Sequence, residues 1–404
     1  MAAGCPRRYD AHLPPLRVGT SGDYAPFSND RDGKLEGYDV DVARRFARDT
    51  GRRIEFVRFA WPELLSDLGT GKFDVAMGGV TIRPERALVG RFTRPVAQTG
   101  AIILTRGGLA RSADDIGRRG VRLAVNGGGH LERVARRLFP AASIMAVSNN
   151  RMLPALLRDG GADAVLTDDV EAPIFEAEIP YVARVGPVTH DRKAYLAKDT
   201  VLTDELDAWL RARAVDGWLD EVSQRWLGRS AARRAFDSDL DALLALVDLR
   251  LSFMPAVAAA KESAGRPIED TAQETRVLEA AREQGVDRGL EQASVEALVR
   301  AQLAAARAAQ QQFLALPRDQ RPPVQQLDLV REARPALSSL METIIARAAD
   351  VATAPKALSG LDAGLLAQAF DPLVAPRGER IALARAIIGL RRSGAHEPDG
   401  DPAR

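Results

Sequence analysis

Residues 16–46 read LRVGTSGDYAPFSNDRDGKLEGYDVDVARRF, and this stretch decides the fold class of the first half of the chain. Leu16–Thr20 is a short run that contains β-branched residues, which is typical of a strand. Val40–Thr50 has the residue pattern of a helix. A strand followed by a helix, when the pair recurs along a chain, indicates an α/β architecture with mainly parallel sheets.

The same alternation continues beyond this stretch. A further helix pattern is Met152–Asp159. Ligands of such folds bind beyond the carboxyl ends of the strands, so candidate site residues are expected there. The further candidate strands are Arg53–Phe59, Asp74–Met77, Ala101–Thr105, Val121–Asn126, Ser143–Val147 and Ala164–Thr167.

The second half of the chain has a different composition. All four tryptophans and all five tyrosines lie before residue 227, and the sequence beyond is rich in Ala, Leu, Arg and Glu. Apolar residues recur with a helical period in Leu240–Glu262, Val295–Phe313 and Leu327–Ala346, and Pro317 is one of the breakers between them. These patterns predict a bundle of long helices.

The composition change divides the chain into four parts. Residues 1–15 are an N-terminal tail, 16–228 an α/β domain, 235–350 a helical domain, and 351–404 a helical extension. The polar end from Ser393 is expected to be disordered.

Composition excludes several classes of protein. The net charge of +1 gives no electrostatic footprint for nucleic acid, and no apolar run approaches the length of a membrane span. One cysteine and four scattered histidines exclude a disulfide framework and argue against a zinc site. We therefore expect a protein without metal or cofactor.

The start of the chain leaves two interpretations open. Residues 1–5, which end at Cys5, resemble the end of a bacterial lipoprotein signal without its hydrophobic segment. Either they are a disordered tail of a cytoplasmic protein, or the true start lies upstream. In the second case the protein is exported to the periplasm, and a lipid anchor at Cys5 is compatible with that.

Five segments in the first half resemble type II solute-binding proteins, over roughly residues 16–228. The resemblance implies an α/β, two-lobed, periplasmic-binding-protein-like domain that closes over a ligand. It also implies that the chain returns to the first lobe after about residue 188. The segments are Gly22–Phe27, Gly37–Ala43, Trp61–Leu64, Phe73–Met77 and Thr81–Arg86.

The residues of these segments suit an anionic ligand. Arg86 offers a fork of donors that fits a carboxylate, although a surface arginine is the alternative. Trp61 and Tyr24 are candidate walls for a ring, or ordinary core residues. The glycines after Asn126 expose backbone N–H groups that can hold an anion. The candidate substrate-binding residues are Tyr24, Trp61, Thr81, Arg86, Asn126, Asp168 and Lys193.

Residues 166–172 carry the candidate chemistry. Asp168 resembles the aspartate with which amino-acid receptors of this family meet a ligand ammonium. Glu171 stands three residues later, where receptors usually have a small apolar residue and where one helical turn gives it a similar face. In this glutamate, and in Lys193–Leu196, the chain resembles the cyclohexadienyl dehydratase branch. The resemblance implies that Glu171 is the general acid.

A carboxylic acid suits the reaction that this branch performs. Prephenate becomes aromatic by losing carbon dioxide and its ring hydroxyl, and hydroxide needs a proton in order to leave. Burial beside Asp168 would raise the pKa of Glu171 and keep it protonated. A solvated glutamate at a helix start is the alternative. His130 replaces a threonine common in the branch, and Gly79 lies where a serine is common nearby, so prephenate and arogenate both remain candidates.

Two cations lie on the apolar face of the helix predicted from Leu240. Arg250 and Lys261 are eleven residues apart and share that face with Val247 and Met254. An unpaired buried charge is costly, so each cation either reaches solvent or binds an anionic ligand.

The surrounding segments resemble the all-helical chorismate mutases, particularly the exported subclass, to about residue 347. This implies an all-α chorismate-mutase bundle in which Arg250, Lys261 and Arg334 hold the carboxylates and ether oxygen of chorismate. Asp270 would accept from the ring hydroxyl, and Gln310 would donate to the ether oxygen. The segments are Val247–Arg250, Val257–Lys261, Ile268–Asp270, Val299–Leu303 and Leu329–Arg334.

Two positions depart from the mutase pattern, and a third, Gln302, has no predicted role in the site. Gln273 replaces a usual arginine, and Arg276, one turn later, is a candidate to reach inward instead. Ala306 replaces a usual Ser or Thr, which predicts a weakened mutase. Gln302 is interpreted as an ordinary surface amide.

Together, the two resemblances predict a bifunctional enzyme of phenylalanine biosynthesis. Chorismate would become prephenate in the bundle, and prephenate (or arogenate) would become phenylpyruvate (or phenylalanine) in the cleft. The main alternative is an exported amino-acid receptor with a degenerate, structural or sensory helical domain. A homo-oligomer is compatible with the sequence.

Overall fold

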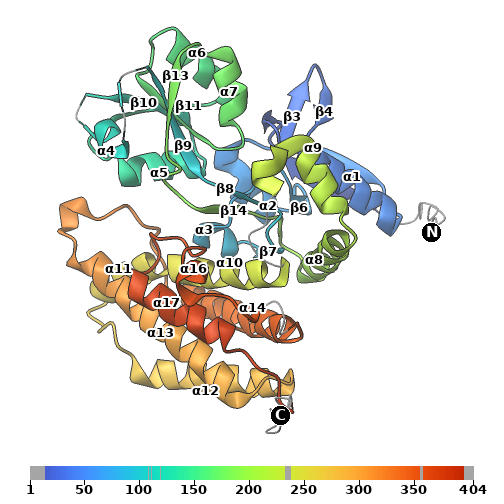
Figure 1. The fold of residues 1–404 in the computed structure, drawn as a ribbon, viewed down its shortest axis with the longest axis vertical. Coiled ribbons are helices and arrows are strands. Elements are labelled where there is room, and N and C mark those ends of the chain that lie inside the picture. The colour runs from blue at the N-terminus through green and yellow to red at the C-terminus, as the bar shows by residue number, and fades with distance from the viewer. Residues whose placement is uncertain are drawn as a thin grey trace, which may run out of the picture. The chain divides into compact units, whose positions relative to one another are not determined.

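The computed structural model describes residues 14–107, 109–110, 112–118, 120–232, 238–354 and 358–394. The chain forms two compact units, one within residues 1–238 and one within residues 239–404 (Figure 1). Cys5, most of the predicted tail 1–15, and most of the polar end predicted to be disordered lie outside the described residues. Ser393 lies inside them, and its backbone N–H donates to the carbonyl of Gly289 at 3.0 Å.

The first lobe of the front unit is a five-stranded sheet in the order β5-β1-β6-β15-β7. Strand β1 pairs in parallel with β5 and β6, whereas β15 runs antiparallel to β6 and β7. The strands are β1 (Leu16–Thr20), β5 (Ile54–Arg58), β6 (Val75–Ala76), β7 (Arg91–Phe92) and β15 (Leu196–Ala197). The helices of this lobe are α1 (Tyr38–Thr50), α2 (Leu64–Gly69), α3 (Pro84–Ala87), α8 (Thr200–Val215) and α9 (Trp218–Ala232), and a small antiparallel sheet joins β2 (Asp23–Tyr24), β3 (Ser28–Arg31) and β4 (Lys34–Glu36).

The second lobe is a five-stranded sheet in the order β11-β10-β12-β9-β13. Strand β10 pairs in parallel with β11 and β12, and β9 is antiparallel to β12 and β13. The strands are β9 (Ala101–Arg106), β10 (Arg122–Asn126), β11 (Ser143–Val147), β12 (Ala164–Asp168) and β13 (Val182–Val185). The helices are α4 (Ala113–Ile116), α5 (His130–Leu138), α6 (Leu153–Arg158) and α7 (Ala172–Glu178).

Two antiparallel strands connect the lobes. Strand β8 (Ala97–Thr99) leads out of the first lobe, and β14 (Asp191–Lys193) returns to it, so the return predicted after about residue 188 is confirmed. All seven predicted strands are present, with ends that differ by one residue at most. The sheets are mainly parallel, as predicted, and one strand in each runs against the others, β15 in the first lobe and β9 in the second. Both of these strands enter their sheet directly from a crossing segment rather than through a helix.

The rear unit consists of helices (Figure 1). Helices α11 and α12 pack on α13, α14 packs on α12, and the extension helices α16 and α17 pack on each other, with α17 also on α13. The helices are α10 (Ser238–Ser252), α11 (Met254–Ser263), α12 (Thr271–Asp287), α13 (Gln292–Ala315), α14 (Arg334–Ala352), α16 (Ala363–Ala367) and α17 (Arg377–Ile388), with a π-helical turn, η4 (Leu329–Ala333), before α14.

The single helix predicted over Leu240–Glu262 is wrong in one respect. Helix α10 ends at Ser252, and α11 begins at Met254 with Pro255 in its first turn. Proline has no backbone N–H, so it cannot continue the hydrogen-bond ladder of the preceding helix. The two helices nevertheless place Arg250 and Lys261 on the same cavity.

Within the described residues, Asp239–Ser263 is long and apolar enough to cross a membrane by length and composition alone. Its most apolar window is 72% buried inside the protein. Such burial is typical of the core helix of a bundle, so this stretch is weak evidence for a membrane span.

Candidate active sites

A cavity of about 40 Å³ lies between the two lobes of the front unit. Pockets that hold small organic ligands are commonly about 300–1,000 Å³, so the lobes must move apart to admit an organic substrate. A Cβ built on Gly128 of the second lobe would lie 2.4 Å from Cγ of Pro62 in the first, which shows how closely the lobes approach. The cavity is lined by Tyr24, Trp61, Gly79, Thr81, Arg86, Asn126, Gly129, His130, Leu131, Asn150, Glu171 and Lys193.

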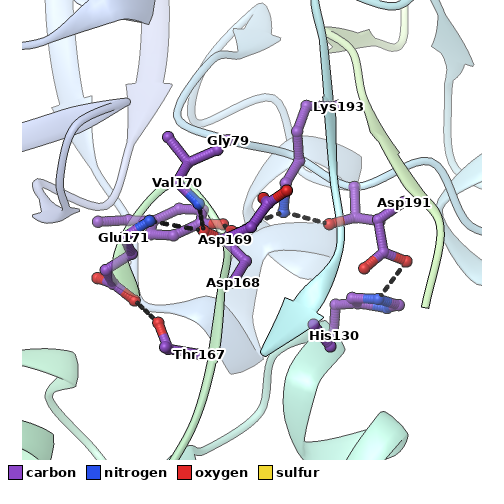
Figure 2. A network of polar contacts seen from close by, with 12 residues as sticks. Gly79, His130, Thr167, Asp168, Asp169, Val170, Glu171, Asp191 and Lys193 are labelled. Carbon is purple, nitrogen blue, oxygen red and sulfur yellow. Dashed lines mark hydrogen bonds and ion pairs between the residues drawn. The ribbon is translucent and has the colours of Figure 1, made fainter. Parts of the chain in front are cut away.

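Glu171 is buried in this cavity, with 2% of its surface exposed. It directly precedes α7, as the helix-start interpretation requires, but it is not solvated. Thr167 donates to one carboxylate oxygen at 2.5 Å, as Figure 2 shows, and the side-chain amide of Asn150 donates to the other. Burial, followed by the negative charge of Asp168, raises the pKa of Glu171 from 4.5 to about 8. The side chain is therefore protonated near neutral pH.

Asp168 and Glu171 do not share a helix face, contrary to the prediction. Asp168 is the last residue of β12, and its Oδ1 accepts the backbone N–H groups of Val170 at 3.1 Å and of Glu171 at 2.9 Å (Figure 2). The turn from strand to helix, rather than a helical period, brings the two carboxyl groups together. Burial is also the largest cause that raises the pKa of Asp168.

Arg86 contacts two residues of its own lobe, Thr81 and Trp61. Its Nη1 donates to the carbonyl of Thr81 at 2.7 Å, and its guanidinium lies 5.6 Å from the centre of the Trp61 ring. Only 5% of Arg86 is exposed, and among the residues that the structure describes no carboxylate forms an ion pair with it. Burial lowers its pKa to about 9, which still leaves the guanidinium charged at neutral pH. A buried cation that faces a cavity without a counter-charge suits an anionic ligand.

The sequence analysis missed Asn150 in this cavity and named His130 only as a departure from the dehydratase branch. Asn150, in the turn that follows β11, is buried and donates to Glu171. Its place after the carboxyl end of a strand was the available signal. His130 lies at the first position of α5, and its Nε2 is 2.8 Å from Oδ1 of Asp191. The hydroxyl of Thr189 donates to the other oxygen of Asp191, Oδ2, at 2.6 Å. This pairing joins α5 of the second lobe to the crossing strand β14.

The pKa of Glu171 predicts how dehydration depends on pH. If Glu171 donates a proton, kcat/KM is expected to be constant below about pH 7 and to fall about tenfold per unit above its pKa of about 8. The measurement is a pH–rate profile with prephenate, with chorismate consumption by the same protein as the internal control. A profile that rises from pH 7 to pH 9 would exclude an acid role for this side chain.

A second cavity, of about 680 Å³, lies inside the helical unit. Side chains of α10, α11, α12, α13 and α14 and the segment between α11 and α12 surround it. All the residues predicted for a mutase site line it, namely Arg250, Lys261, Asp270, Gln310 and Arg334.

Arg250 is the buried cation of this cavity. Its exposed fraction is 5%, and its Nε and Nη1 have no hydrogen-bond partner among the described residues. Burial lowers its pKa to about 10. The snorkelling alternative is therefore wrong for Arg250, because the side chain does not reach solvent. The unsatisfied donors are a place for an anionic ligand.

Three other polar residues that line the cavity have partners within the protein. Lys261 donates to the carbonyl of Ile268 at 2.5 Å, and Arg334 donates to Oδ2 of Asp270 at 3.4 Å. Asp270 also caps α12 by accepting the N–H of Gln273 at 3.0 Å. These short-range contacts hold two cations and one carboxylate around the same space.

Helix α13 carries two glutamines that the sequence analysis considered. Gln310 lines the cavity as expected, whereas Gln302 is not at the surface. Gln310 donates to the carbonyl of Ala306 at 3.1 Å, and its Oε1 has no partner among the described residues. Gln302 is completely buried, so its interpretation as a surface amide is wrong. Its helix packs that face inward, towards Met341 at 4.0 Å.

Two further arginines, Arg276 and Arg307, also line the cavity, in which Gln273 replaces the arginine usual in mutases. Arg276 lines the cavity but is exposed, and it donates to Gln273 at 2.8 Å. Arg307, which the sequence analysis missed, lines it as well and pairs with Glu274 at 2.6 Å. Its position three residues before Gln310, on the same helix face, could have indicated it.

No metal centre emerges from the described residues, because no group of three or more His, Cys, Asp or Glu is placed to hold a metal ion. The expectation of a reaction without metal or cofactor stays a prediction.

The two units match two different protein families. Residues 16–229 match the bacterial extracellular solute-binding proteins, family 3, and residues 237–311 match chorismate mutase type II. The chain is 33% identical over 220 residues to a cyclohexadienyl dehydratase of Pseudomonas aeruginosa, which covers 52% of this chain and 82% of that protein. It is 30% identical over 224 residues to a probable amino-acid ABC transporter-binding protein of Haemophilus influenzae, with coverage of 53% and 84%.

Solved structures agree with the fold of the front unit. An ancestral amino acid-binding protein, described as a precursor of cyclohexadienyl dehydratase, has a TM-score of 0.50 at 32% identity and covers 52% of this chain and 95% of its own. A putative ABC-transporter binding component from Wolinella succinogenes, complexed with lysine, has a TM-score of 0.50 at 29% identity, with coverage of 52% and 95%. The two-lobed fold class is confirmed.

Proposed function

Because the chain belongs to the bacterial extracellular solute-binding proteins of family 3 and also carries a type II chorismate mutase region, we propose that it is a bifunctional enzyme. It isomerises chorismate to prephenate in the helical unit. It then converts prephenate to phenylpyruvate in the cleft of the front unit, or arogenate to phenylalanine. Both steps belong to phenylalanine biosynthesis.

One observation carries the dehydratase activity. Glu171, buried and with its pKa raised to about 8, lines the same closed cavity as Arg86. In the reaction the carboxylic acid gives its proton to the ring hydroxyl, which leaves as water. The ring carboxylate leaves as carbon dioxide, and the electron pair of that bond completes the aromatic ring. Glu171 remains as a carboxylate and is reprotonated from solvent.

Three features position the substrate for this step. Arg86 is placed to hold the side-chain carboxylate, because its charge has no counter-ion among the described residues. Trp61 supplies a flat wall, and its indole N–H has no partner in the part of the chain that the structure describes. Asn150 and Thr167 fix the orientation of the acid. Closure of the lobes excludes water, which strengthens each of these contacts.

The mutase activity is supported by the unpaired donors of Arg250 in the second cavity. The rearrangement of chorismate is unimolecular, so the site needs to hold the enolpyruvyl arm over the ring and to stabilise charge on the breaking C–O bond. Arg250, Lys261 and Arg334 would hold the carboxylates and the ether oxygen. Gln310 would donate to the ether oxygen, and Asp270 would accept from the ring hydroxyl.

The competing proposal is an exported amino-acid receptor. The relative from H. influenzae is named as such a binding protein. Glu171 argues against this function here, because a receptor gains nothing from a buried acid that must be kept protonated. The decisive experiment incubates the purified protein with chorismate and follows prephenate and phenylpyruvate together. Tight binding of an amino acid without turnover of either compound would favour the receptor.

Lys261 provides a direct test of the mutase site. Replacement of Lys261 by alanine is expected to lower chorismate consumption by at least about 10²-fold, since one charge-assisted contact is commonly worth that much. The dehydration of added prephenate by the same variant serves as the control. Wild-type consumption of chorismate by this variant would exclude Lys261 from the site.

The family description also supports a location outside the cytoplasm. We propose that the protein is exported to the periplasm and that Cys5, which lies outside the described residues, is its lipid-attachment site. Cell fractionation with and without a Cys5→Ser substitution tests both parts of this proposal. Light scattering of the purified protein, which gives its molar mass in solution, tests whether the protein forms a homo-oligomer.

A further inference from the structure

The cavity of the helical unit has an excess of positive charge. Three of the described charged residues that line it, Arg266, Glu269 and Arg276, are exposed, so solvent screens their charges. The others are four cations and two carboxylates, which leaves an excess of two positive charges. This excess equals the charge of a dicarboxylate such as chorismate, and Arg307 is needed for the match. The partly or fully buried charged residues are Arg250, Lys261, Arg307, Arg334, Asp270 and Glu274.

Arg307 belongs to the group of charges around Lys261. Its Nη1 donates to Oε2 of Glu274 at 2.6 Å, and 33% of its side chain is exposed. Burial lowers the pKa of Lys261, and the negative charges of Asp270 and Glu274 oppose this effect. Glu274 on α12 therefore lies within electrostatic reach of both Lys261 and Arg307, which α13 carries. The positive charge of Arg307 is thus placed near a residue of the proposed mutase site.

Glu274 uses only part of the guanidinium of Arg307. Arginine has five N–H donors in a planar fork. Nη1 donates to Glu274, whereas Nε and Nη2 have no hydrogen-bond partner among the described residues. Gln310, three residues later on the same helix face, lines the cavity as well. A guanidinium that one carboxylate holds in place can bind a second carboxylate with its remaining donors.

We propose that Arg307 is a further substrate-binding residue of the helical unit, which holds one carboxylate of chorismate while Glu274 fixes its orientation. This inference rests on the proposed mutase function. A carboxylate keeps its charge throughout the rearrangement, so a contact with it stabilises the bound substrate and the transition state equally. Arg307 therefore contributes to the binding of chorismate and not to the rate of the chemical step.

The test measures kcat and KM for chorismate separately in Arg307→Met. KM is expected to rise about 10–100-fold, since a hydrogen bond between charged groups commonly contributes a factor of this size, and kcat is expected to stay within about threefold of the wild type. Arg307→Lys keeps the charge and can keep the pair with Glu274, so it is expected to raise KM less than Arg307→Met does. Arg300→Met, which removes an exposed arginine of the same helix that does not line the cavity, is the matched control and is expected to keep the wild-type KM.

A double variant separates contact with the substrate from neutralisation of Glu274. In Glu274→Gln/Arg307→Met the glutamine needs no counter-charge, and the excess of two positive charges is restored without Arg307. KM is expected to stay raised, because the carboxylate of chorismate still lacks its donors. A wild-type KM in this double variant or in Arg307→Met, or a fall in kcat at constant KM, overturns the inference and leaves the mutase function standing. A wild-type protein that does not consume chorismate overturns the function, and the inference with it.

Discussion

Replacement of Glu171 by glutamine is expected to lower phenylpyruvate formation about 10²–10⁴-fold while prephenate accumulates from chorismate. Glutamine has nearly the same shape, and the amide of Asn150 can still donate to its oxygen. The hydroxyl of Thr167 can rotate to accept from the new amide. Only the transferable proton is removed. Activity is measured by following both products after addition of chorismate.

The unfolding temperature of the same variant shows whether it is correctly folded. The pKa of Glu171 is raised from 4.5 to about 8, so the folded protein binds this proton more tightly than the unfolded chain does. The stability that this proton gives is complete below about pH 4.5 and is lost as the pH rises through about 8. Glu171→Gln is therefore expected to unfold at a higher temperature than the wild type at pH 8 and at a similar temperature at pH 4.5. Unchanged dehydration in a well-folded variant removes Glu171 from its role.

Replacement of Arg250 by methionine is expected to lower kcat/KM for chorismate about 10²–10³-fold, while dehydration of added prephenate stays at the wild-type level. The guanidinium is buried, and its Nε and Nη1 have no partner among the described residues, so the ligand is the group that would use them. Methionine fills a similar volume and needs no partner. The thermal stability of the helical unit is therefore expected to rise as its activity falls.

A control variant tests whether the loss of activity requires removal of a charge at the cavity rather than of any arginine of the helical unit. Arg300 is an exposed arginine of α13 that pairs loosely with Glu296 at 3.8 Å and does not line the cavity. Arg300→Met is expected to leave chorismate consumption within about twofold of the wild type. If Arg250→Met consumes chorismate as fast as Arg300→Met does, the second cavity is not a mutase site.

The two activities form a sequence, because the product of the helical unit is the substrate of the front unit. The charges of the two cavities suit this order. Chorismate and prephenate are both dianions, and each cavity is lined by at least two cations, Arg250 and Lys261 in one and Arg86 and Lys193 in the other.

The sequence by itself determined the local features of this protein. The seven predicted strands and the boundary between the α/β and the helical parts follow from hydrophobic period and composition, which are properties of neighbouring residues. Arg250 and Lys261 could also be named from their place on an apolar helix face. The other charged residues of the two cavities were named from the family resemblances rather than from a local pattern.

Only the tertiary structure decided burial and pairing. Asp168 meets Tyr24, 144 residues away, and Lys193 meets Thr81, 112 residues away, so neither contact leaves a local pattern. Asn150 reaches Glu171, and Gln302 turns into the core, for the same reason. The pKa that makes Glu171 an acid comes mainly from its removal from water, which depends on how the two lobes enclose it.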